Sequence, residues 1–323
     1  MGKGSAFGKT ILIGDQFVLN GVPAILSALP YQTDTLVERE PKGKGFTVID
    51  NREEIPGYKK KKEKACYKSY EQMIKIMKLD LKKNPIKITV GGNLLAGSGL
   101  GASAAISVSF ARACNKEFKL GLDIINENYI GWEGEHAYHG IPSGVDNTAS
   151  SFGGLMMYMI RDGKKMYERI IPAKPLYVVL ACSGITYNTI LLEKHVEDLI
   201  KNNTRLFYTK LNKITWQVYD MRNAIEKGNL KEAGNIMVQN HKILKEMKLS
   251  HVRLDELCER SIEMGAYGAK LTGGGKGGYM VALVKNSAMQ KKIASKFKSE
   301  NITIITAQLG INAVDNVKFR ILR

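Results

Sequence analysis

A run of glycines and small residues at Gly97–Ala105 has the composition of a phosphate-binding loop, and it leads directly into a segment of helical character. The first backbone N–H groups of a helix lack partners within it and carry partial positive charge, so they attract anions. Glycine lets the backbone approach an anion closely, and the Ser103 hydroxyl is a hard oxygen ligand of the type that suits Mg²⁺. The pattern predicts a nucleotide phosphate cradle formed by Gly97, Ser98, Gly99, Leu100, Gly101, Ala102, Ser103 and Ala104.

Other glycine-rich loops have similar letters, and most of them do not fit the neighbouring sequence. No Gly-Lys-Ser/Thr closes the run, so it is not a Walker loop. The dinucleotide pattern G-x-G-x-x-A does match, and Glu117 follows about twenty residues later, but that fold requires a second strand where Asp123–His139 predicts a helix. The V-A-I-K, H-R-D and D-F-G motifs of protein kinases are absent from the sequence. From this segment alone, a glycine-rich turn without a ligand stays open.

Two carboxylates, Glu135 and Asp146, flank a sequence that must interrupt a helix. The helix is predicted to end near His139–Gly140, because Ile141–Pro142 requires an extended or turn conformation. We therefore expect Glu135 in the last turn of the helix and Asp146 on the loop beyond it. In phosphoryl transfer one carboxylate can hold magnesium while the other accepts the proton of the attacking hydroxyl. Taken alone, Glu135 is equally a solvated helix residue and Asp146 an Asx turn or helix cap.

A second glycine-rich segment, Lys270–Gly278, precedes the strand-like Tyr279–Val284. Four of the five residues from Gly273 to Gly277 lack a side chain, and such a flexible run is entropically costly to order. Close backbone contact with a ligand would explain it, and a flexible hairpin loop explains it equally well.

Taken in this order, the segments resemble the GHMP small-molecule kinase superfamily, which includes galacto-, homoserine, mevalonate and phosphomevalonate kinases. The resemblance runs nearly end to end and includes an N-terminal motif at Gly8–Gly21. Within the superfamily, His139–Asn147 looks most like the mevalonate kinases. Val90–Asn93 before the phosphate loop, and Ser183–Ile185 followed by Thr189, support that reading.

The resemblance implies a role for each matching residue. Lys9 would lie near the attacking hydroxyl, where a cation favours the alkoxide, and Asp146 would be the general base. Ser103 and Glu135 would hold Mg²⁺ on the phosphates of ATP. Gln16 and Thr189 would lie near the substrate, mevalonate, together with Lys9 and Asp146.

The chain departs from the family pattern at a few places. The usual Gly-Glu-His reads Gly14-Asp15-Gln16, and Gln16 can hydrogen-bond a substrate but carries neither a proton nor a charge. A proline frequent ahead of the phosphate loop is Leu95, and Lys276 replaces a residue that is usually small. Alternatives are therefore another kinase of the superfamily, acting on phosphomevalonate or homoserine, or a non-catalytic nucleotide- or RNA-binding relative.

Composition indicates a cytoplasmic globular protein without choosing a reaction. The formal net charge is +17, but lysines are spread along the chain and the dense run Lys59–Lys62 has one aromatic neighbour, Tyr58. We therefore expect a solvated basic surface and no nucleic-acid partner. No apolar run approaches the roughly 20 residues of a membrane span, so no membrane partner is expected. The four scattered cysteines indicate reduced, packed thiols. A homodimer is compatible with the sequence.

At 323 residues the chain exceeds the size of a usual single core, so two domains are expected, 1–174 and 175–323, divided near Pro172–Pro175. Strands are predicted at Thr10–Ile13, Thr47–Ile49, Ile86–Val90, Leu155–Ile160, Leu176–Ala181, Tyr279–Val284 and Ile302–Thr306. Helices are predicted at Tyr67–Met77, Ser103–Asn115, Asp123–His139, Ile190–Lys201, Leu206–Lys227, Leu230–Lys248, Val252–Met264 and Ser287–Lys298. This mixture predicts an α+β fold. The resemblance implies a ribosomal-S5-like N-terminal domain, a ferredoxin-like C-terminal domain and an active site in the cleft between them.

Overall fold

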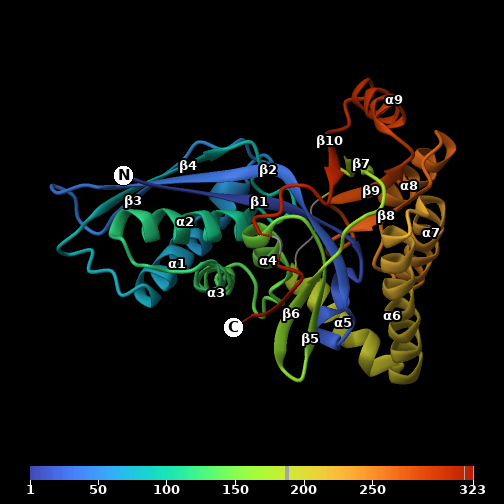
Figure 1. Ribbon diagram of the computed structural model, residues 1–323, viewed down its shortest axis with the longest axis horizontal. Coiled ribbons are helices and arrows are strands. Elements are labelled where there is room, and N and C mark those ends of the chain that lie inside the picture. Colours follow the sequence, from blue (N-terminus) through green and yellow to red (C-terminus); the bar gives the residue numbers. More distant parts are fainter. Residues whose placement is uncertain (186–188, 316, 323) are drawn as a thin grey trace. The chain divides into compact units, whose positions relative to one another are not determined.

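The computed structural model describes residues 1–185, 189–315 and 317–322, and most of its elements are labelled in Figure 1. The chain divides into two compact units. The first contains Met1–Lys9, Ala28–Gly153 and the chain's end from Leu322, and the second contains Thr10–Ser27 and Gly154–Ile321. These units change after Gly153 rather than near residue 174. The division into family domains 1–174 and 175–323 stays a prediction.

The first unit combines the ends of two long strands with a parallel strand pair and four helices. Its elements are parts of β1 (Gly2–Ile13) and β2 (Ala24–Arg39), with β3 (Phe46–Asp50), β4 (Ile86–Gly92), α1 (Tyr58–Ile76), α2 (Ala102–Phe118), α3 (Ile124–Glu135) and α4 (Val145–Phe152). β4 lies between β3, which is parallel to it, and β2, which is antiparallel, so that Ile88 is opposite both Val48 and Val37. A parallel pair needs a crossover, and α1 provides it. The buried side chains of this sheet pack with Tyr70 of α1 and Phe110 of α2 to form the core.

Small residues allow α2 to lie very close to its neighbours. A Cβ on Gly4 of β1 would be 2.1 Å from the carbonyl oxygen of Ser109, and a Cβ on Gly131 of α3 would be 2.5 Å from Cγ2 of Val108. A larger residue at Gly4 would push β1 away from the backbone of α2, and one at Gly131 would displace the Val108 side chain. The glycines therefore determine how β1 and α3 are placed against α2, and with them the side chains that these elements carry.

The second unit contains a four-stranded antiparallel sheet whose strand order is β10-β7-β9-β8. Its strands are β7 (Leu176–Cys182), β8 (Gly268–Thr272), β9 (Tyr279–Val284) and β10 (Ile304–Leu309). Four helices within residues 189–263 are inserted between β7 and β8, and one helix, at residues 287–298, lies between β9 and β10. Numbered by first appearance, the strand order is 4-1-3-2, with a helical connection after the first and third strands. This is the ferredoxin-like βαββαβ arrangement, as expected.

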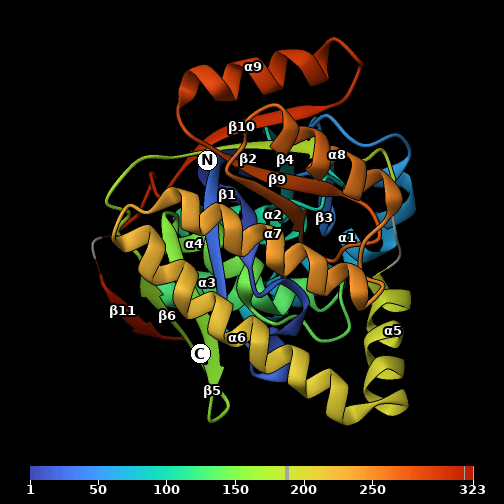
Figure 2. The ribbon, with the colours of Figure 1, turned by 90° about the vertical axis from the view of Figure 1, so that its right-hand side faces the viewer.

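The helices of the second unit are long and amphipathic. Their bounds are α5 (Thr189–Asn202), α6 (Thr204–Glu226), α7 (Leu230–Glu246), α8 (Val252–Glu263) and α9 (Ser287–Lys298). Figure 2 shows α6 and α7 side by side, and a buried hydrogen bond from Asn240 to Gln217 joins them at 3.0 Å. The remaining elements of this unit are the 3₁₀ helix η1 (Asp15–Asn20), β5 (Leu155–Arg161), β6 (Lys164–Arg169) and β11 (Phe319–Ile321).

The observed mixture of sheets and helices confirms the α+β class, and several predicted elements differ in extent. β1 begins at Gly2 rather than Thr10, and α1 begins at Tyr58 rather than Tyr67, because its lysine-rich first turns are helical as well as solvated. β2 is absent from the predicted strands, because Pro30 inside it argues against a strand. Within the part of the chain that the structure describes, no helix is both long and apolar enough to span a membrane.

Candidate functional site

The glycine-rich loop opens into α2, as the sequence predicts. Gly97, Gly99 and Gly101 have φ angles of 82°, 74° and 77°, in the left-handed region that favours glycine. Gly101 is the N-cap residue, no side chain caps the helix there, and its carbonyl oxygen accepts the amide of Ala105 at 2.9 Å. The N–H groups of the first turn of α2 are therefore available to an anion.

Ser103 and Glu135 meet although they lie on different helices. The Ser103 hydroxyl, in the first turn of α2, donates to Oε2 of Glu135 at 3.2 Å. Glu135 is the last residue of α3, so it lies in the last turn as predicted, although the helix ends four residues before the expected end at His139. The two helices come this close because Gly134 has no side chain. A Cβ there would lie only 2.9 Å from the hydroxyl oxygen of Ser107, one turn further along α2. Small residues at the helix contact thus bring the two predicted magnesium ligands together.

Glu135 is a buried carboxylate with one unsatisfied oxygen. Its side chain is 3% exposed, and its Oε1 has no hydrogen-bond partner among the described residues. Burial, and after it the charge of Asp146, raises the pKa of Glu135 to about 8. The hydrogen bond from Ser103 and the charge of Lys9 oppose this rise. A pKa this high favours the neutral acid, and a bound cation would stabilise the ionised form and supply the missing partner of Oε1.

The donors at this position suit a magnesium ion that is shared with phosphate. Within residues 1–185, 189–315 and 317–322, no three His, Cys, Asp or Glu side chains gather into a metal cluster. Mg²⁺ is commonly held by only one or two protein oxygens, the other ligands being substrate phosphates and water. The Ser103 hydroxyl and the unsatisfied Glu135 oxygen, next to an anion-binding helix start, fit that ligand set.

Lys9 and Asp146 form an ion pair near the end of the glycine-rich loop. Lys9 Nζ lies 3.2 Å from Asp146 Oδ1, and the lysine side chain is 5% exposed whereas that of Asp146 is 29% exposed. The Lys9 amide donates to the carbonyl oxygen of Leu100 at 2.7 Å, and its side chain lies against Gly101. The pair therefore combines a buried cation with an accessible carboxylate, the two groups predicted to face an attacking hydroxyl.

Asp146 does not lie on a loop, so that part of the prediction was wrong. It lies in the first turn of α4, which follows a left-handed Gly144 with a φ of 92°. Asn147 of α4 donates to the Asn128 side chain of α3 at 2.9 Å, which holds α4 to α3. The helix thus holds the Asp146 side chain in a fixed place beside Lys9.

A cavity of about 240 Å³ lies beside the first turn of α2. Residues of β3, α1 and α2 line it, and so does the segment that joins β3 to α1. Among the lining residues are Ser103, Ile106, Tyr58, Cys66 and Tyr138. The cavity mixes apolar and aromatic walls with polar groups, which is typical of small-molecule sites. The sequence did not indicate these walls, because they come from segments with no common motif.

In the second unit, residues 10–21 of the N-terminal motif lie together with the second glycine-rich segment. Lys270 and Asp15 form a buried ion pair, and the Gly273 amide donates to Asp15 at 2.9 Å. A Cβ on Gly274 would lie 2.9 Å from Nε2, the side-chain amide nitrogen of Gln16. Asp15 therefore links the segment that carries Gln16 to the start of the glycine-rich segment. Nothing in the sequence indicates this pairing, since its two charges lie far apart in the chain.

The last predicted substrate residue is Thr189. The backbone of α5 begins at Thr189, as the structure describes it, and the Thr189 side chain lies outside the described residues. Gln16 and Thr189 belong to the second unit, whereas Lys9, Ser103, Glu135 and Asp146 belong to the first. The roles of all six residues stay predictions.

Comparisons with known proteins agree with this arrangement of motifs. The family model described as "GHMP kinases N terminal domain" matches residues 64–154, and "GHMP kinases C terminal" matches residues 221–303. Mevalonate kinase of Pyrococcus furiosus is 30% identical over 315 residues, which cover 91% of this chain and 92% of that protein. The chain therefore belongs to the GHMP kinases, and it is an enzyme.

The fold is also similar to those of solved structures. A crystal structure of L. major mevalonate kinase in complex with R-mevalonate has a TM-score of 0.90 and 33% sequence identity, and the match covers 97% of each chain. Mevalonate kinase of Methanococcus jannaschii, with a TM-score of 0.78 and 20% identity, shares the fold. These relatives, similar along nearly the whole chain, are mevalonate kinases. The family resemblance read from the motifs is confirmed.

Proposed function

We propose that this enzyme transfers the γ-phosphoryl group of ATP to the primary hydroxyl of mevalonate, giving 5-phosphomevalonate. The observation that carries the proposal is the Lys9–Asp146 pair beside a glycine-rich helix start. This arrangement supplies a cation and a carboxylate next to a place that suits phosphates. The similarity to mevalonate kinases over most of the chain supports mevalonate as the acceptor.

The triphosphate would bind at the first turn of α2, where N–H groups and the helix dipole attract anions. The cavity beside that turn, lined by Tyr58 and Ile106 among others, would take the adenosine. Its lining also includes Lys60 and Lys62, whose charges attract a polyanion.

The acceptor hydroxyl would lie between Lys9 and Asp146. Asp146 takes the hydroxyl proton as the oxygen bonds to the γ-phosphorus and the bond from that phosphorus to the ADP oxygen breaks. Lys9 stabilises the negative charge that develops on the attacking oxygen. Gln16 and Thr189 would bind other polar groups of the substrate. Most of the rate acceleration would come from positioning and charge stabilisation, because the transition state is loose.

Ser103 and Glu135 would hold a magnesium ion on the phosphates. When bound, this ion neutralises charge on the β- and γ-phosphoryl oxygens. The hydrogen bond between them holds the Ser103 hydroxyl beside the Glu135 carboxyl group. The unsatisfied Oε1 of Glu135 supports this assignment, since a cation removes the cost of burying it.

A coupled assay of ADP release tests the proposal, with mevalonate, phosphomevalonate and homoserine compared at equal concentrations. We expect release with mevalonate, and little with the other two. Faster release with phosphomevalonate or homoserine would assign the enzyme to another reaction of the superfamily. No acceptor-dependent release, combined with strong and salt-sensitive binding of RNA, would instead support the non-catalytic alternative.

A further inference from the structure

The segment Asp50–Lys59, here called the brace, contacts the phosphate loop Gly97–Gly101 at both ends. At the start of the loop, the Ala96 amide donates to the carbonyl oxygen of Glu53 at 2.8 Å. The Ile55 amide donates in turn to the carbonyl oxygen of Ala96 at 2.9 Å. This pair of hydrogen bonds forms a short parallel bridge. The backbone immediately before the loop is therefore fixed to the brace.

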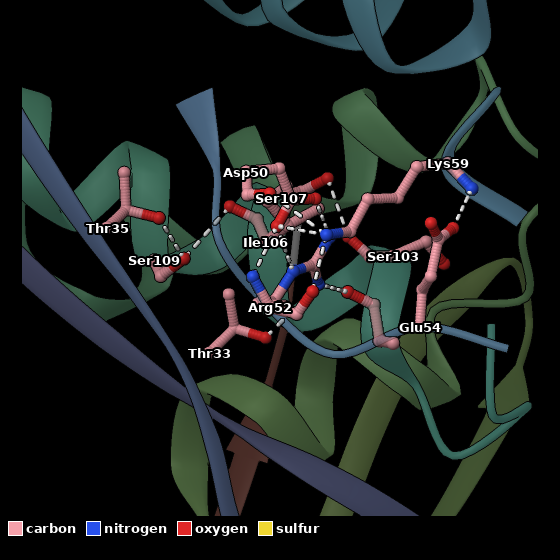
Figure 3. A network of polar contacts seen from close by, with 11 residues as sticks. Thr33, Thr35, Asp50, Arg52, Glu54, Lys59, Ser103, Ile106, Ser107 and Ser109 are labelled. Carbon is pink, nitrogen blue, oxygen red and sulfur yellow. Dashed lines mark hydrogen bonds and ion pairs between the residues drawn. The ribbon is translucent and has the colours of Figure 1, made fainter. Parts of the chain in front are cut away.

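At the other end of the loop, the contact is made by a buried side chain of the brace. Nη1 of Arg52 donates to the carbonyl oxygen of Ala102, the first residue of α2, at 3.2 Å. The same nitrogen lies 3.4 Å from the hydroxyl oxygen of Thr33 on β2. Arg52 is 6% exposed, and Figure 3 shows its guanidinium at the centre of this polar network. Arg52 thus ties the start of α2 to the sheet.

The guanidinium of Arg52 is itself held in one orientation. Its Nε and Nη2 donate to the two carboxylate oxygens of Asp50 at 3.0 and 2.8 Å, a bidentate geometry that fixes the plane of the guanidinium. Burial alone would raise the pKa of Asp50, but the hydrogen bond and charge of Arg52 hold that pKa below its ordinary value. The positive charge of Arg52 is therefore matched by a negative one beside it.

Lys59 and Glu54 complete the brace. Lys59 Nζ donates to the carbonyl oxygen of Asp50 at 2.9 Å and also to that of Arg52, and its amide donates to Glu54 at 2.6 Å (Figure 3). Lys59 thus belongs to the interior of this network, in contrast to the solvated lysine run expected from the sequence. Its contacts close the turn that carries Arg52.

We propose that the brace sets the shape of the phosphate loop, and that Arg52 is a positioning residue for the triphosphate of the nucleotide, an inference that rests on the proposed function. The loop contains three glycines with positive φ and so has little rigidity of its own. The direction of its N–H groups then depends on how its two ends are held. Arg52 and Asp50 also line the cavity assigned above to the adenosine. Because Asp50 neutralises Arg52, the arginine acts on the triphosphate through the loop rather than as a free charge on phosphate.

The test compares Arg52→Lys and Arg52→Met with a matched control, Arg112→Met. Arg112 is a partly buried arginine of the first unit, 14% exposed in its side chain, which pairs with Glu127 at 3.2 Å and donates to the carbonyl oxygens of Ser5 and Ser151. It lies nine positions beyond Ser103 on α2, about 13 Å along the helix axis. Loss of Arg112 therefore removes an equivalent set of contacts away from the phosphate loop.

We expect Arg52→Met to raise KM for ATP about tenfold, with KM for mevalonate changed less than twofold. Arg112→Met should lower the melting temperature comparably and leave KM for ATP unchanged. Arg52→Lys keeps the charge but cannot span Asp50 and Ala102, so it should fold and still raise KM for ATP at least threefold. An unchanged KM for ATP in Arg52→Lys would overturn the proposal, and this variant decides the question if Arg52→Met does not fold.

Asp50→Asn distinguishes positioning from direct contact with phosphate. If Arg52 acts through the loop, loosening its partner raises KM for ATP about threefold. If Arg52 instead binds phosphate directly, releasing its charge lowers KM for ATP, and the proposal is wrong.

Calorimetric titration with Mg²⁺ and ATP tests the proposed function separately from the role of Arg52. Wild-type protein that does not bind ATP refutes the proposed function, whereas equal ATP binding by wild type and Arg52→Lys refutes only the role of Arg52.

Discussion

Replacing Gly101 with alanine should lower kcat by more than the accompanying loss of folding stability explains. Gly101 has a φ of 77°, and a Cβ there would lie 2.8 Å from Cγ of Lys9. An L-residue in the left-handed region costs about 1–2 kcal/mol, which is the loss of stability we expect from the backbone alone. The contact adds a second effect, because Lys9 must move by several tenths of an ångström away from its position near Asp146.

The size of the catalytic effect follows from that displacement. A misplacement of about 1 Å in an active site can cost about a hundredfold in rate, so a smaller shift of Lys9 should lower kcat by about tenfold. Gly121→Ala is the matched control, since Gly121 has a φ of 67° in the same unit and a Cβ there would meet no atom within 4 Å. It should lose the same stability and keep its kcat.

The assay measures kcat with saturating ATP and mevalonate, together with the urea midpoint of both variants. If Gly101→Ala and Gly121→Ala lose equal stability and both keep wild-type kcat, the placement of Lys9 by the loop has no catalytic consequence. That result would refute the reasoning.

Three further predictions concern single side chains. Asp146→Asn should lower kcat by about 10²–10⁴-fold, the usual contribution of a general base, and calorimetry should find ATP binding within twofold of wild type; a variant with near-wild-type kcat would remove Asp146 from that role. Glu135→Gln should raise the Mg²⁺ concentration needed for half-maximal rate by about tenfold or more at fixed ATP, and an unchanged Mg²⁺ titration would argue against Glu135 as a ligand. Burial holds the pKa of His241 in the folded protein below its ordinary value, despite the attraction of Asp255. The stability that the neutral imidazole contributes is therefore present above about pH 6.5, the ordinary pKa of histidine, and is lost as the pH falls through the lower pKa of the folded protein. The urea midpoint should therefore fall between pH 7 and pH 5 more steeply in wild type than in His241→Gln, and equal slopes would contradict this.

Much of the fold is readable from sequence because its signals are local. The predicted bounds of α9 match the observed ones, since Asn286 caps the helix by accepting the Met289 amide at 3.0 Å. Gly101 ahead of an alanine-rich segment marks the start of α2 to within one residue. By contrast, the sequence predicts a loop around Gly144, although the left-handed glycine there begins α4. A glycine with positive φ serves both turns and helix starts, and local sequence does not separate them.

The candidate site is only partly predictable for a different reason. Lys9, Ser103, Glu135 and Asp146 are identifiable because motifs mark them, and the structure places them in two contacting pairs. Arg52 belongs to no motif. Its proposed role depends on a hydrogen bond to the carbonyl oxygen of Ala102, which lies 50 positions further along the chain.

The Asp15–Lys270 pair joins residues 255 positions apart, and sequence reasoning missed it for the same reason. A single sequence records which charges exist. It does not record which of them meet.

The central claim is phosphoryl transfer to a primary alcohol, and ³¹P nuclear magnetic resonance of the reaction products tests it most directly. With ATP, Mg²⁺ and R-mevalonate, we predict a new phosphomonoester signal split into a triplet by the two protons of the adjacent CH₂ group, in equal amount to the ADP formed. ADP accompanied only by inorganic phosphate, or a phosphomonoester signal without that splitting, would contradict the account.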